Sequence, residues 1–151
     1  MDNHRIEIWY RTGVFDPGSQ GICNDILDLG IKGITAVETG SIFLIKGKIS
    51  PASLTKVARE LLADPVTQEF YSGKRALPKG TVSVEVWFKK GVTDTVGETA
   101  RKGIADLGIT GKFAVSTARR YLLYGKNISK KKTEAIANRL LANEVLQTYK
   151  I

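Results

Sequence analysis

The chain alternates stretches in which apolar side chains recur every second residue with stretches in which they recur at helical spacing. Residues 6–10 alternate apolar and polar, which is the period of a half-buried strand. Asp16-Pro17 is typical of a helix start, and Gly30 of a helix end. The pattern then predicts, in order, strands at about 34–39 and 42–47 joined at Gly40-Ser41, a helix from Ser50-Pro51, and a strand at about 66–71.

This whole pattern occurs twice. Glu7-Ile8-Trp9-Tyr10 returns as Glu85-Val86-Trp87-Phe88 at an offset of 78 residues, and the match continues through most of the chain. In the second copy the pattern predicts a helix from Asp94 to Gly108, strands near 112–117, 120–125 and 145–150, and a helix with the apolar stripe Thr133, Ile136, Ala137, Leu140 and Leu141. We therefore divide the chain into a first repeat (1–72), a linker (73–80) and a second repeat (81–151).

The β-α-β-β-α-β order of each repeat predicts an α+β protein made of two tandem ferredoxin-like units. In such a unit both helices cover one face of an antiparallel sheet, and the other face needs cover of its own. That face carries Trp9 and Trp87, with Glu7 and Glu85 beside them. We predict that the two sheets pack face to face as a pseudo-dimer, with these four residues at the interface between the repeats.

The composition removes several classes of chemistry. Cys23 is the single cysteine, which excludes an internal disulfide and a Cys-rich zinc site. His4 is the single histidine, and we expect it near a frayed terminus, where it cannot serve metal or Ser/His/Asp chemistry. Asp16 and Asp94 are explained as helix caps, and we assign no catalytic, cofactor-binding or metal-binding residue. The apolar runs are too short to cross a bilayer and the start lacks a secretion signal, so we expect a cytoplasmic protein with no membrane partner.

The positive charge belongs to one repeat. The net charge is +8, with ten Lys and Arg against nine Asp and Glu in residues 1–80 and thirteen against six in residues 81–151. Basic residues beside aromatic ones can bind RNA, but the strand at 41–45 lacks the exposed aromatic run of an RNA-recognition sheet. A solvated face, or a surface matched to an acidic protein partner, is favoured over nucleic acid. The candidate surface for such a partner consists of Lys89, Lys90, Arg119, Arg120 and Tyr121.

Several segments resemble a known family. The helix after Asp16-Pro17, residues 33–37 (GITAV) and residues 61–70 (LLADPVTQEF) are similar to the PurS family, the small subunit of phosphoribosylformylglycinamidine synthase. In the second repeat, residues 91–97 and 117–123 resemble the PurS-like pair at the N-terminus of some large synthase chains. Typical members hold one copy, whereas this chain holds two.

The resemblance implies a non-catalytic assembly subunit, or an N-terminal assembly domain, in purine biosynthesis. Its partners would be a synthetase (PurL-type) and a glutaminase (PurQ-type) subunit, which together form a glutamine-dependent, ATP-consuming ligase complex, and the chain could also self-associate. No cofactor of its own is implied. Two alternatives remain open, which are a tandem ACT-like module that binds small molecules and an RNA-binding tandem ferredoxin-like protein.

Overall fold

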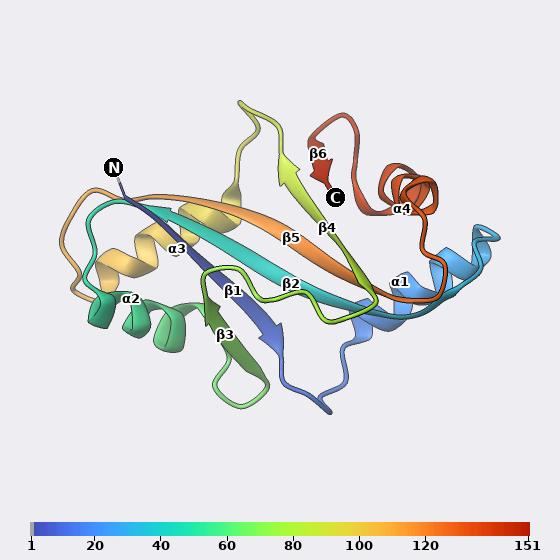
Figure 1. The fold of residues 1–151 in the computed structure, drawn as a ribbon. Coiled ribbons are helices and arrows are strands. Elements are labelled where there is room, and N and C mark those ends of the chain that lie inside the picture. The colour runs from blue at the N-terminus through green and yellow to red at the C-terminus, as the bar shows by residue number, and fades with distance from the viewer. Residues whose placement is uncertain (1) are drawn as a thin grey trace. The chain divides into compact units, whose positions relative to one another are not determined.

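The computed structural model describes residues 2–151, in which six strands form one sheet with the order β3-β1-β2-β5-β4-β6 (Figure 1). The strands are β1 (Asn3–Tyr10), β2 (Ile34–Lys46), β3 (Gln68–Ser72), β4 (Thr81–Phe88), β5 (Ala114–Gly125) and β6 (Gln147–Lys150). The helices are α1 (Pro17–Asp28), α2 (Pro51–Val57), α3 (Thr95–Asp106) and α4 (Lys130–Ile136). Single π-helical turns, η1 (Ala58–Leu62) and η2 (Ala137–Leu141), extend α2 and α4. The class is α+β with antiparallel strands, as expected.

The two predicted hairpins are wrong, because β2 and β5 are each one continuous strand (Figure 1). Gly40-Ser41 was interpreted as a turn, yet both residues lie in the middle of β2. Gly40 is buried and is not among the residues with positive φ, so it continues the strand instead of reversing it. Each repeat therefore has the order β-α-β-α-β.

The strands of both repeats belong to one six-stranded sheet, whereas two separate sheets were predicted. With a hairpin in each repeat, the strands of that repeat would pair only with one another and form a sheet of their own. All six strands instead join one sheet, in which β2 and β5 are the two central strands.

The chain forms two compact units, and each unit takes elements from both repeats. Unit 1 consists of the chain up to Val14 together with Ser41–Arg75 and Thr93–Thr117, and unit 2 consists of Phe15–Gly40, Ala76–Val92 and Ala118–Ile151. Unit 1 thus receives α3 and the start of β5 from the second repeat, while unit 2 receives α1 and the start of β2 from the first. In each unit a helix and an edge of the sheet are supplied by the other repeat, as in domain swapping.

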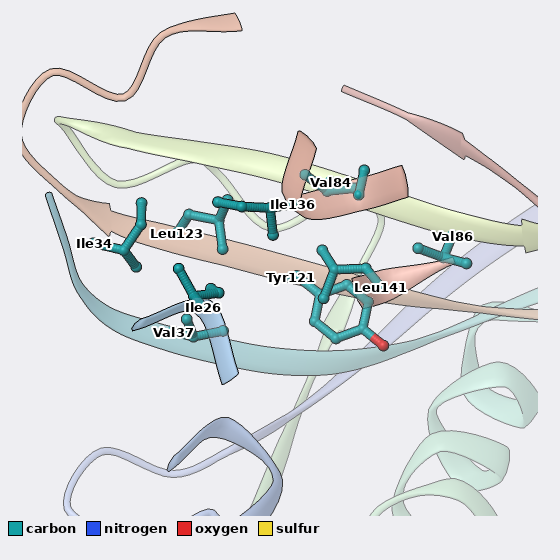
Figure 2. Close-up of a cluster of buried hydrophobic side chains, with 10 residues drawn as sticks. Ile26, Ile34, Val37, Val84, Val86, Tyr121, Leu123, Ile136 and Leu141 are labelled. Atoms are coloured by element: carbon teal, nitrogen blue, oxygen red, sulfur yellow. The ribbon is translucent and has the colours of Figure 1, made fainter. Parts of the chain in front are cut away.

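Each unit has its own apolar core between its helices and its strands. In unit 1 the buried side chains are Ile6, Ile8, Phe43, Ile45, Val57, Ala58, Ala100 and Ile104. In unit 2 Ile26 of α1 and Ile136 and Leu141 of the α4–η2 helix meet the strand residues (Figure 2). Those strand residues are Ile34, Val37, Val84, Val86, Tyr121 and Leu123. Burial of this apolar surface is the main force that holds each helix on the sheet.

The caps expected from the sequence are confirmed. Asp16 accepts hydrogen bonds from the amides of Gly18 and Ser19, and Asp94 accepts one from Gly97. Ser50 and Ser129 cap α2 and α4 in the same way. Satisfying the free amides at a helix start explains why these polar residues recur in both repeats.

Close backbone contact fixes the position of α3 on β5. A Cβ atom on Gly97 would collide with the carbonyl oxygen of Val115, which is part of the backbone and cannot easily move. Gly21, in α1, has open space around its Cα atom and ordinary helical geometry. Gly21 can therefore serve as the control for a substitution at Gly97, because both glycines lie in helices and only Gly97 is crowded.

We expect Gly97→Ala to lower the free energy of unfolding by about 1–3 kcal/mol, because the added methyl group pushes α3 away from β5. Gly21→Ala should leave stability unchanged or raise it by up to about 1 kcal/mol, since alanine favours the helix. Urea denaturation of the two variants checks both values. Equal stability of the two variants would contradict the close contact at Gly97.

Candidate interaction surfaces

A tryptophan and a glutamate form the same pair in β1 and in β4. Ile6 and Ile8 face the core of unit 1, so Glu7 and Trp9 point to the opposite face of the sheet. Trp9 is only 1% exposed, and its Nε1 donates to Oε1 of Glu7 over 3.0 Å. In unit 2, Nε1 of Trp87 donates to Oε1 of Glu85 over 3.1 Å.

The two carboxylates are buried and held in polar networks. Glu7 is fully buried, and Nη2 of Arg5 lies 2.7 Å from its Oε2. Glu85 stands opposite Arg120 in the β4–β5 register, and Nε of Arg120 donates to Oγ of Ser83 over 2.9 Å. A buried charge is tolerated only when it is paired and hydrogen-bonded. Glu7 and Glu85 therefore hold the neighbouring tryptophan side chains in place on this face of the sheet.

Each indole also has a cation against its ring. The guanidinium carbon of Arg75 lies 4.7 Å from the centre of a Trp9 ring, and Nζ of Lys150 lies 5.5 Å from Trp87. Such contacts contribute about 0.5–2 kcal/mol, more when water is excluded. Trp87 is half-buried. The role of Trp9, Trp87, Glu7 and Glu85 at an interface between the repeats stays a prediction.

Two of the five residues predicted to form a partner surface are buried. Arg120 is 1% exposed, and Tyr121 lies in the core of unit 2 (Figure 2), so neither offers a surface to a partner. Lys89, Lys90 and Arg119 are exposed. The burial of Arg120 and Tyr121 could not be predicted from the sequence. Strand alternation assigns side chains to two faces of a sheet, but it does not show that both faces are covered along this part of β5.

Asp16 and Asp94 each tie a helix start to a long strand. Oδ2 of Asp16 accepts hydrogen bonds from the hydroxyls of Ser19 (2.6 Å) and Thr39 (2.8 Å). Asp94 accepts from the amide and the hydroxyl of Thr117, over 2.6 and 2.8 Å. Burial acts to raise the pKa of Asp16, but the hydrogen bonds from Ser19, Thr39 and Gly18 together hold this pKa below its usual value.

An apolar pocket of about 290 Å³ opens on unit 1 between η1, β2 and α3. Its lining residues are Phe43, Leu61, Leu62, Thr95, Val96, Thr99 and Ala100. The threonines offer polar atoms at its α3 side, and no charged side chain belongs to this lining.

The remaining candidates have ordinary surroundings. Cys23 is half-buried and packs against the core of unit 2. His4 lies inside β1 and not in a frayed end. Across residues 2–151, no group of three or more His, Cys, Asp or Glu side chains could hold a metal ion. Every helix in this range is too short or too polar to cross a membrane.

The architecture is that of a tandem ferredoxin-like α+β protein, and a family comparison agrees with it. The PurS family model, described as phosphoribosylformylglycinamidine (FGAM) synthase, matches residues 3–73 and again residues 81–151. The chain therefore belongs to the PurS family and carries two copies of its unit. A search of curated proteins finds no match.

We expect Trp9→Ala to lower the free energy of unfolding by about 3–5 kcal/mol, the range for a large buried aromatic side chain. Trp87→Ala should cost about 1–2 kcal/mol, because its side chain is less buried than that of Trp9. Chemical denaturation followed by circular dichroism compares the two variants. Equal losses would contradict the difference in burial.

The cap at Asp16 predicts a pH-dependent contribution to stability. Because the folded-state pKa lies below the unfolded value of 3.8, the ionised side chain stabilises the fold above that pH and loses this effect as the pH falls through the folded pKa. Asp16→Ala should cost about 1 kcal/mol at pH 7 and less below pH 3.8.

Asp16→Asn is the control, since asparagine caps helices but does not titrate. It should cost less than Asp16→Ala at pH 7. Unfolding free energies measured from pH 7 down to pH 3 give both curves, and a constant gap between wild type and Asp16→Ala would refute the linkage.

Proposed function

We propose that this chain is a non-catalytic assembly component of FGAM synthase, as a separate subunit or as an N-terminal domain. In this role it docks a glutaminase on a synthetase, so that ammonia released from glutamine reaches the synthetase without loss to solvent. It acts in the cytoplasm.

The observation that carries the proposal is the double match to the PurS family model, which spans nearly the whole chain. Amidine formation with ammonia released from glutamine needs a nucleophile, an ATP site and a binding site for the ribonucleotide. The repeated polar residues of this chain are instead engaged in caps and buried networks. A docking role uses exposed surface and needs none of these sites.

The ACT-like alternative gains little support. An amino-acid ligand carries an ammonium and a carboxylate group, and both need charged or strongly polar partners when buried. The pocket on unit 1 offers two threonines and otherwise apolar side chains.

The RNA-binding alternative is also disfavoured. Sheet-face readers of RNA stack bases on exposed aromatic rings. Here Trp9 is buried and Phe43 belongs to the core of unit 1.

The decisive experiment reconstitutes the ligase from the synthetase and glutaminase subunits of the same organism, with and without this chain. FGAM formation from glutamine should depend on the chain, because only a docked glutaminase delivers ammonia directly. FGAM formation from added ammonium chloride should depend on it much less, since the synthetase then needs no glutaminase.

Size-exclusion chromatography of the same mixtures supplies the matching physical measurement. All three proteins should co-elute when the chain is present. Equal glutamine-dependent rates and equal elution volumes without the chain would refute the docking role.

A further inference from the structure

Five lysines gather at one corner of unit 2, where β2 begins, β5 ends and α4 starts. They are Lys32, Lys126, Lys130, Lys131 and Lys132, which we call the lysine corner. Backbone contacts bring the segments together, since the amide of Lys126 donates to the carbonyl of Gly33 over 3.0 Å. Nζ of Lys132 donates to the carbonyl of Lys32 over 2.9 Å.

The charges of the lysine corner are not neutralised within the described chain. Lys32, Lys126, Lys130 and Lys131 are exposed and Lys132 is half-buried. No carboxylate of residues 2–151 lies in ion-pairing distance of any of them, including Glu134 of the same helix. Like charges this close repel one another within a Debye length of about 8–10 Å. Among residues 2–151, no carboxylate in ion-pairing distance offsets this repulsion.

Unit 1 gives an internal comparison. The positions equivalent to the five lysines are Thr110, Lys48, Pro51, Ala52 and Ser53, all of which belong to unit 1. Only one of the five is a lysine. The fold is the same at both sites, with a serine cap on each helix, so the fold does not require the charge. Four of the five lysines lie in the second repeat and account for much of its positive surplus.

We propose that the lysine corner is a docking surface for an acidic patch on one of the two partner subunits. This inference rests on the proposed function. Exposed, flexible ammonium groups spread over three segments suit a broad acidic protein surface, where complementary charge speeds association and sets orientation.

Nucleic acid fits the lysine corner less well. The nearest aromatic side chain in sequence, Tyr124, is half-buried and its hydroxyl donates to Glu38, so it offers no open ring for base stacking. The corner also lacks arginine, whose planar group makes paired hydrogen bonds with phosphate.

The test replaces three lysines of the corner with neutral residues of similar length. Lys126→Gln, Lys130→Gln and Lys131→Gln are combined in one variant, because these side chains are exposed and make no hydrogen bond within the fold. The control combines Lys46→Gln, Lys48→Gln and Lys112→Gln, three exposed lysines of unit 1. Both variants lose the same net charge.

Binding of each full-length variant to the synthetase and to the glutaminase is measured at low and at physiological salt. For one of the two subunits, the corner variant should bind about tenfold more weakly than wild type, with a flatter dependence on salt. The control variant should stay within about twofold of wild type. Equal losses in the two variants would overturn the proposal, because net charge alone would then explain binding.

Unchanged binding of the corner variant would also overturn it, and would leave the proposed function intact. If wild type binds neither subunit, the proposed function fails as well, so the two failures are distinguishable. Binding to a single-stranded poly(U) RNA is measured in parallel. Loss of RNA binding without loss of partner binding would replace the acidic protein with nucleic acid as the occupant.

Discussion

The pairing of two long strands, β2 and β5, is the constraint on which the remaining structure depends. Each strand contributes one part to unit 1 and the other part to unit 2, and the helix that precedes it, α1 before β2 or α3 before β5, lies in a unit with a helix of the other repeat. A break in either strand would separate a helix from its sheet in one unit and remove an edge in the other. The two units are therefore linked covalently through the continuous backbone of both strands.

The backbone is packed most tightly where this strand pair ends. A Cβ atom on Gly125 would collide with the carbonyl of Gly33, and one on Gly47 would lie 2.8 Å from the carbonyl of Lys112. Glycine at both places lets two chain segments approach more closely than any side chain allows. These two contacts fix the relative register of β2 and β5 within each unit, and the caps at Asp16 and Asp94 then set where α1 and α3 depart from it.

Local features were predictable from the sequence, and long-range ones were not. Caps, helix stripes and the duplication follow from residue spacing, and all of them occur as expected. The predicted turn at Gly40-Ser41 is wrong because glycine and serine are typical of turns but also fit a buried strand that has little room for side chains. Whether such a pair forms a turn or continues a strand depends on the neighbouring strands, which the local sequence does not show. Arg120 failed as a surface residue because its partners, Ser83 and Glu85, come from a strand 35 or more residues away in sequence.

The buried glutamates at positions 7 and 85 carried a clear signal in the repeat, since a charged residue kept beside the same tryptophan in two copies indicates a common contact. This contact is a hydrogen bond from the indole to the carboxylate two residues earlier. It could have been inferred, because residues i and i+2 of a strand lie on the same face of the sheet. The cations that lie over the rings could not, because Arg75 belongs to the linker, where no periodicity constrains its position.

Fusion of the two copies has a consequence for how an assembly is oriented. A homodimer of identical units presents every surface twice, so a partner meets two equivalent sites and its stoichiometry follows the symmetry. In the fused chain the corner at the start of α4 carries five lysines, while its counterpart at the start of α2 carries one. Tandem duplication thus allows the two copies to differ in charge, so that a partner can distinguish one unit from the other.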